Sequence, residues 1–268
     1  MAAQAPKALV IFDLVSTLTD AAPRYVRAFA DVCAAHGHTP PPEAEILEML
    51  GNKSLPDIIQ HFIGDMPEDL RKVFMQDCNS SCDALLRRAD WREELFPNVR
   101  EAIETLRMMG VTLGIYTGTR EDALAAQLAY HGLTDLFDAR YIRGKDNTRD
   151  AGIKTADLKA AQMADIVAAF RRDAGNDAVF VVIGDSSADA AAATRQGLDF
   201  AGFARDARKR DEMARAGVLH VMRDFADLPD FVMRFIRPAG NDNAQTQRAP
   251  ENVPQGKSAA RPWSPPKP

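Results

Sequence analysis

The stretch Ala8-Leu-Val-Ile-Phe-Asp13-Leu-Val-Ser-Thr-Leu-Thr-Asp20 begins with an apolar run and changes abruptly to acidic and hydroxyl side chains. Such a run is typical of a short, fully buried parallel strand. Two further runs have the same form, one over 111–116 that ends in Thr117-Gly-Thr and one over 178–183 that ends in Gly184-Asp-Ser-Ser. Helical patterns over 99–109, 121–131 and 156–170 lie between and around them. This alternation predicts an α/β protein with a doubly wound parallel sheet, a Rossmann-like core.

The segment from 23 to 92 breaks the alternation. It predicts helices over 25–35, 43–50, 55–62 and 68–88, and no strand interrupts them. We therefore expect a core of residues 1–20 and 93–237 with an inserted all-helical cap of residues 21–92. Residues 238–268 are mostly Asn, Gln, Pro, Ala, Lys and Ser, which cannot bury enough apolar surface to offset their ordering entropy, so we expect a disordered tail.

Composition restricts the class of protein. The chain has 268 residues, is 46% hydrophobic and 26% charged, and carries a net charge of −5, as ordinary soluble globular proteins do. This balance argues against a nucleic-acid partner or an anionic membrane surface. Three cysteines cannot all pair within one chain, and the N-terminal apolar segment is too short to span a bilayer. We expect a cytoplasmic protein, either a monomer or a homodimer.

The ends of the three predicted strands carry the polar residues of interest. Because parallel strands end at the same edge of a sheet, Asp13, Thr117, Asp185 and Asp189 are expected to converge. Carboxylates that lie close together repel one another unless a cation neutralises them, and Mg²⁺ prefers oxygen ligands of this kind. The alternative is that each aspartate only caps the helix that follows it.

These strand ends also resemble a known family. Phe12-Asp-Leu-Val-Ser-Thr-Leu resembles the first motif of the haloacid dehalogenase (HAD) superfamily of hydrolases, and Ile115-Tyr-Thr117-Gly resembles the second. Gly184-Asp-Ser-Ser-Ala-Asp189 is similar to the fourth. The resemblance extends from residue 8 to about residue 225, with the helical cap in the expected place. The motif pattern is nearest to phosphonatase-like and phosphoglycolate-phosphatase-like members.

The resemblance implies an Mg²⁺-dependent hydrolase that acts on a small phosphorylated or phosphonate substrate. Asp13 would attack phosphorus and form an aspartyl-phosphate, which divides one difficult displacement into two easier ones. The metal ligands would be Asp13, the main-chain carbonyl of Val15, Asp185 and Asp189, the last through water. Thr117 would hold phosphate oxygens, and the remaining substrate contacts are expected from the same loops: Ser16, Thr17, Gly118 and Arg120.

The third motif of the superfamily is a lysine that neutralises the phosphate, and the sequence offers two. Lys154 stands just before an expected helix start, where this lysine belongs. Lys159 lies inside that helix, at a distance from Asp185 nearer to the family's usual spacing. Both alternatives stay open at this point.

Val15 departs from the family pattern. HAD phosphatases normally have a second Asp at this position, which protonates the leaving group and then activates water. Three interpretations follow: a phosphonatase-like hydrolase with an acid–base group from the cap, a catalytically impaired protein that binds a phospho-ligand or a protein partner, and a metal-free haloacid dehalogenase. The retained Gly184-to-Asp189 motif argues against the last of these.

The cap supplies candidates of its own. In phosphonoacetaldehyde hydrolases a cap lysine forms a Schiff base with the substrate, and Lys53, in Gly51-Asn-Lys53-Ser, stands at a similar distance after the nucleophile. Gly51 suggests a loop between two cap helices, but the surrounding residues do not match that family's pattern, so substrate contact and an uninvolved surface position remain alternatives. Arg24 and Tyr25 open the first cap helix near the expected cleft, where a substrate contact and a plain helix start are both open.

Overall fold

The structure is a computed structural model that describes residues 7–236, except for residues 89, 147–149 and 151–152. The described residues form one compact unit. The predicted tail, 238–268, lies outside the described residues. No described helix is both long enough and apolar enough to cross a membrane.

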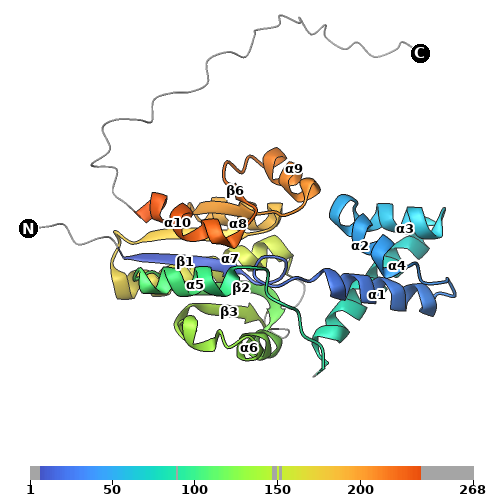
Figure 1. Ribbon diagram of the computed structural model, residues 1–268, viewed down its shortest axis with the longest axis horizontal. Helices are drawn as coiled ribbons and strands as arrows, with labels where there is room; N and C mark the ends of the chain where they lie inside the picture. Colours follow the sequence, from blue (N-terminus) through green and yellow to red (C-terminus); the bar gives the residue numbers. More distant parts are fainter. Residues whose placement is uncertain (1–6, 89, 147–149, 151–152, 237–268) are drawn as a thin grey trace, which may run out of the picture. The chain divides into compact units, whose positions relative to one another are not determined.

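A six-stranded, entirely parallel sheet forms the centre of this unit (Figure 1), in the order β3-β2-β1-β4-β5-β6. The strands are β1 (Ala8–Asp13), β2 (Thr112–Arg120), β3 (Ile142–Lys145), β4 (Val179–Gly184), β5 (Asp199–Phe203) and β6 (Val221–Met222). The three predicted runs are β1, β2 and β4, which are the three adjacent central strands. The α/β fold class expected from the sequence is confirmed.

Alternate residues of β1 are buried against different helices, as the pleat of a strand requires. Val10 and Phe12 belong to a core cluster that includes side chains of α5 (Val99–Met108), α6 (Glu121–Tyr130) and α10 (Leu228–Ile236). Leu9 and Ile11 belong to a second cluster, with α7 (Thr155–Ala174) and α8 (Ser187–Arg195). The sheet is therefore covered on both faces, so the exposed carboxyl edge is where the strand-end side chains can meet.

The first four of the five helices between β1 and β2 in the sequence fall in the segment 21–92, where helices were expected. They are α1 (Ala22–Ala35), α2 (Glu43–Asn52), α3 (Leu55–Ile63) and α4 (Glu68–Leu86), and they share an apolar cluster of their own. One detail of the expectation was wrong: Gly51 lies within α2, and the turn falls on Lys53 and Ser54. The reason is that Ser54 is the N-cap of α3, where its hydroxyl and the Asp57 carboxylate form a reciprocal capping box.

Shorter elements complete the fold. They are η1 (Thr134–Leu136), η2 (Ala139–Tyr141), α9 (Ala207–Arg215) and η3 (Phe225–Asp227). The helix α9 follows β5 and brings the basic segment 205–210 to the carboxyl edge of the sheet, where several of its side chains line the cavity described below.

Candidate active site

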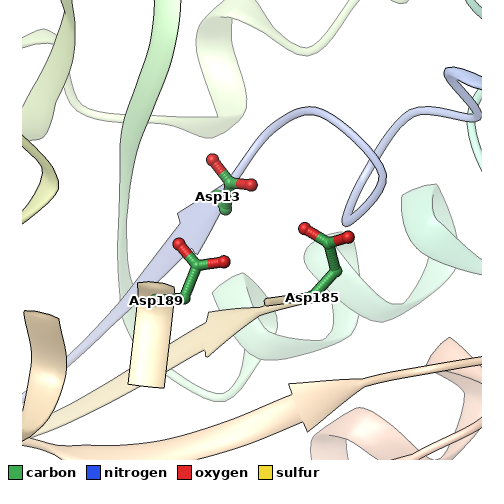
Figure 2. Close-up of side chains that lie close together, drawn as sticks. All are labelled: Asp13, Asp185 and Asp189. Carbon is green, nitrogen blue, oxygen red and sulfur yellow. The ribbon is translucent and has the colours of Figure 1, made fainter. Parts of the chain in front are cut away.

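Three buried aspartates meet at the carboxyl edge of the sheet (Figure 2). Asp13 is the last residue of β1, Asp185 follows β4, and Asp189 lies in the first turn of α8. One carboxylate oxygen from each lies within 4.8 Å of the others. Their exposed fractions are only 2%, 7% and 0%. Oxygen atoms gathered in this way form a group that can hold a divalent cation.

The charge of Asp13 is strongly opposed by its surroundings. Burial, followed by repulsion from Asp189, raises the pKa of the Asp13 carboxyl to about 7, although the ammonium group of Lys159 and the backbone N–H of Leu14 act in the opposite direction. A carboxylate in this state is stabilised by any additional positive charge near it. The site therefore favours binding of a cation.

Lys159 reaches this cluster from the second turn of α7. Its Nζ lies 2.6 Å from Asp189 Oδ1 and 3.3 Å from Asp13 Oδ2. Burial works against the charged form of Lys159, yet the two neighbouring carboxylates raise its pKa overall, so it stays protonated. Lys154, by contrast, is the exposed N-cap residue of α7. The structure thus brings Lys159, and not Lys154, to the aspartates.

Asp189 is held by four donors. Tyr116 Oη and Lys159 Nζ donate to Oδ1, at 2.9 and 2.6 Å, while Ser186 donates to Oδ2 through Oγ at 2.6 Å and through its backbone N–H at 3.1 Å. Gly184 permits this arrangement, because a Cβ on it would lie 2.6 Å from the Asp189 Cβ. Asp189 is the N3 residue of a capping box whose N-cap is Ser186, so it helps to cap α8, in part as the alternative interpretation held, and it also contacts Tyr116 and Lys159 in the site.

The loop after β1 turns sharply beside Asp13. Ser16 has a φ of 61°, and the backbone N–H groups of Leu18 and Thr19 both donate to the Leu14 carbonyl, at 2.8 and 3.0 Å. Thr17 is fully buried, and its Oγ1 has no hydrogen-bond partner among the described residues. A buried hydroxyl without a partner is costly, so a bound oxyanion or water at this loop would stabilise it.

The second strand end is built from Thr117, Gly118 and Thr119. The Thr119 backbone N–H donates to Thr117 Oγ1 at 3.1 Å, and Gln162 Nε2 donates to the Thr117 carbonyl at 3.0 Å. These bonds fix the hydroxyl of Thr117, whose residue is 1% exposed. Arg120 is paired with Asp122 on the surface side.

A cavity of about 1050 Å³ adjoins the cluster and is lined by the strand ends and by α1 to α4 and α9. Of the candidate residues that the sequence analysis named, eleven line it: Asp13, Val15, Ser16, Arg24, Tyr25, Lys53, Thr117, Gly118, Arg120, Lys159 and Asp185. Thr17, Lys154 and Asp189 are not among its lining residues. Lys53 is exposed and follows the last residue of α2.

Several lining residues were not predicted. Lys209 of α9 forms an ion pair with Asp185, and burial, only partly offset by Glu212 and Asp13, lowers its pKa to about 8. Arg205 and Arg208 line the same cavity. Their signal in the sequence is the basic run Arg205-Asp-Ala-Arg-Lys-Arg210, which follows a short strand that the sequence pattern does not mark.

Comparison with known proteins agrees with this site. A family profile described as haloacid dehalogenase-like hydrolase matches residues 7–197, which span β1, the four helices, the aspartate cluster and Lys159. This chain belongs to that family. It is therefore an enzyme of the hydrolase class.

Relatives of this hydrolase include phosphoglycolate phosphatases. One from Cereibacter sphaeroides is 29% identical over 235 residues, which cover 85% of this chain and 98% of the relative. One from Rhodobacter capsulatus is 27% identical over 225 residues, which cover 83% and 95% of the two chains. The matched regions thus extend well beyond the motifs.

Solved structures of haloacid dehalogenase-like proteins share the fold. One from Streptococcus pneumoniae has a TM-score of 0.57 at 18% identity and covers 84% of this chain and 98% of its own. A HAD family hydrolase from Deinococcus radiodurans, solved with bound phosphate and sodium, has a TM-score of 0.55 at 20% identity and covers 86% and 97%. At these identities the likeness concerns the fold alone.

Proposed function

We propose that this hydrolase is an Mg²⁺-dependent enzyme that cleaves a small phosphate ester or phosphonate through an aspartyl-phosphate on Asp13. The observation that carries the proposal is the arrangement at the end of β1, where Asp13 lies 3.3 Å from the ammonium group of Lys159 and within reach of Asp185 and Asp189. The names of the relatives make 2-phosphoglycolate the first ester to test.

The donor set fits a magnesium ion. Asp13, Asp185 and the main-chain carbonyl of Val15 would be its protein ligands, because all three residues line the cavity at the strand ends. Asp189 would act through a water molecule, since four donors already satisfy its carboxylate. The ion would supply positive charge that offsets the repulsion between a carboxylate nucleophile and an anionic phosphoryl group.

The protein groups have separate tasks. Asp13 would attack phosphorus in line with the leaving oxygen, and the phosphoryl-aspartate would then be hydrolysed by water. Lys159 and the fixed hydroxyl of Thr117 would bind phosphoryl oxygens as negative charge develops on them. Ser16 lies in the loop beside Asp13 and lines the cavity, which supports a substrate contact there, whereas Thr17 lies in the same loop but is fully buried and outside the cavity lining.

Val15 has no ionisable group, so the loop after β1 offers no residue at this position to protonate the leaving group or to activate water. A group from the four-helix segment 21–92, acting as a cap, would have to supply these proton transfers, and Lys53 lines the same cavity as Asp13. This placement supports a substrate contact by Lys53, which in a phosphonatase-like reaction would be a Schiff base with a substrate aldehyde. Lid closure by the helices would exclude water during the reaction.

A substrate screen tests the proposal. Purified enzyme is incubated with and without Mg²⁺ against phosphate esters that include 2-phosphoglycolate, against phosphonoacetaldehyde, and against 2-haloacids. Mg²⁺-dependent phosphate release supports the proposal, and release from phosphonoacetaldehyde alone assigns the phosphonatase branch. Halide release without metal would contradict the proposal, and binding of phosphate compounds without any turnover would identify an impaired member.

A further inference from the structure

Arg24 is a buried cation in the cavity wall that the proposed chemistry does not use. The residue lies in the first turn of α1 and is 4% exposed. Its Nε donates to Glu93 Oε1 at 2.6 Å, and both side chains of this ion pair are almost fully buried. Arg24 nevertheless lines the same cavity as Asp13 and Lys159.

The partner of Arg24 is itself fixed on its other side. Glu93 Oε2 accepts a hydrogen bond from Thr19 Oγ1 at 2.8 Å, and the Glu93 carbonyl lies 2.6 Å from His131 Nε2. The guanidinium carbon of Arg24 also lies 5.1 Å from the ring centroid of Tyr25. These contacts hold the Arg24 side chain in one position without any contribution from a ligand.

One edge of the guanidinium group has no partner. Glu93 engages only Nε, and neither terminal Nη atom makes a hydrogen bond with any residue that the structure describes. A guanidinium group presents its two Nη atoms as a planar fork that matches the two oxygens of a carboxylate or phosphate. A buried and oriented fork of this kind is a built site for an oxyanion.

The charge of the cavity agrees with that ligand class. Among the described lining residues nine are Lys or Arg and five are Asp, although the whole chain has a net charge of −5. A substrate with a single phosphoryl group would be served by Lys159, Thr117 and a metal ion alone. The excess of basic side chains therefore points to a ligand that carries a second negative group.

We propose that Arg24 binds a second oxyanion of the substrate, a carboxylate or a second phosphoryl group, and so selects doubly anionic phospho-compounds. This inference rests on the proposed function, since it assumes that the first phosphoryl group lies at Asp13. Glu93 is a positioning residue that orients the fork. Selectivity arises because a phospho-compound without a second negative group leaves the two Nη atoms of Arg24 unpaired, and a buried unpaired donor is costly.

Three phosphonates that lack a scissile ester test this directly. They are 3-phosphonopropionate, with a carboxylate, ethane-1,2-bisphosphonate, with a second phosphoryl group, and propylphosphonate, which is neutral at that end. Calorimetric titration in Mg²⁺ gives each Kd. We expect the enzyme to bind at least one doubly anionic probe about 10- to 100-fold more tightly than propylphosphonate, the range of one charged hydrogen-bond pair.

Variants assign this preference to Arg24. Arg24→Met should abolish it while leaving the Kd of propylphosphonate within about threefold. If Arg24→Met unfolds, the double variant Arg24→Met with Glu93→Gln replaces it. The second change removes the carboxylate charge of Glu93, which the single change would leave buried without a partner. The Gln side chain still offers an acceptor to Thr19. Arg27→Met is the matched control, because Arg27 is an exposed residue of the same helix paired with Asp31.

The outcomes separate the inference from the function on which it rests. Equal binding of all three probes by the wild-type enzyme, or a preference that survives in the Arg24 variants, overturns the role of Arg24 and leaves the phosphoryl site intact. Failure of the wild-type enzyme to bind any of the three overturns the phosphoryl site and the inference together. Loss of the preference in the Arg24 variants but not in Arg27→Met supports both, and the probe with the larger loss identifies the second oxyanion.

Discussion

The Nζ atom of Lys159 lies 3.3 Å from Oδ2 of Asp13, so α7, which packs against one face of the sheet, supplies a cation to the end of the central strand β1. This pair has an electrostatic consequence before any ligand arrives. Asp13 is held partly ionised against the cost of burial, and Lys159 is held protonated by the carboxylates around it. Under the proposed function, an incoming phosphoryl group would meet the carboxylate of Asp13 and the positive charge of Lys159 already in place.

Replacement of Lys159 tests which lysine serves the site. Lys159→Met should lower kcat/KM for the best phosphate ester by about 10²-fold or more, the usual effect of removing one donor to a developing oxyanion. Lys154→Met should change it less than about twofold, because Lys154 is exposed and does not line the cavity. Steady-state kinetics decide this. Equal losses in the two variants would contradict the assignment.

The raised pKa of Asp13 predicts how the stability of the metal-free protein depends on pH. Because the folded-state pKa, about 7, lies above the ordinary value of 3.8, this carboxyl stabilises the fold at low pH and loses that contribution as the pH rises to 7. Between pH 5.5 and 8 the free energy of unfolding should fall by about 2 kcal/mol more in the wild-type protein than in Asp13→Asn. Urea unfolding in EDTA measures it. If the free energy of unfolding depends on pH in the same way in both proteins, the pKa of Asp13 is not raised.

Gly184 should tolerate no side chain. In Gly184→Ala the new Cβ would lie 2.6 Å from the Asp189 Cβ and 2.8 Å from the Tyr116 hydroxyl oxygen, so the aspartate must move. We expect a loss of about 1–3 kcal/mol in the free energy of unfolding and weaker Mg²⁺ binding. Gly118→Ala is the control for stability, because a Cβ there meets nothing within 4 Å. A stable Gly184→Ala protein with unchanged metal affinity would show that Asp189 is not held as described.

Val15→Asp tests the missing acid. If the enzyme is a phosphatase that lacks this group, a carboxyl two residues after Asp13 should raise the turnover of simple phosphate esters, since such groups typically contribute about 10²–10⁴-fold. The comparison uses kcat for one ester in both proteins, with Val15→Asn as the isosteric control. If Val15→Asp does not raise kcat for the ester, and the wild-type enzyme cleaves a phosphonate, the result would favour acid–base chemistry from the helical segment.

The three central strands were predictable from the sequence, and the outer strands β3, β5 and β6 were not. β1, β2 and β4 each contain a short, mostly apolar run, because they are buried on both faces. β5 has an exposed first residue and only three buried ones, and β6 has two residues, so neither produces a recognisable run. The edge strand β3, Ile142–Lys145, has four residues of which only one is fully buried, so it also produces no recognisable run.

The residues of the candidate site also differ in how far the sequence alone predicts them. Asp13, Thr117 and Asp185 stand at strand ends, so sheet topology alone predicts that they converge. The choice between Lys154 and Lys159 depends on which face of α7 points to the sheet edge, which spacing alone does not determine. Lys209 depends on the position of α9 beside Asp185. The sequence analysis named Arg24 as a candidate near the cleft, but the orientation of its side chain depends on Glu93, far along the chain. Contacts of that kind leave no local pattern in a single sequence.

Binding of beryllofluoride tests the central claim most directly, because BeF₃⁻ mimics a phosphoryl group on an aspartate. Fluorine NMR of the wild-type enzyme should show bound BeF₃⁻ resonances that require Mg²⁺, and Asp13→Asn should show none, because that variant loses the proposed nucleophile and a proposed metal ligand together. Equal, Mg²⁺-independent binding by Asp13→Asn would contradict the claim that Asp13 is the phosphoryl acceptor.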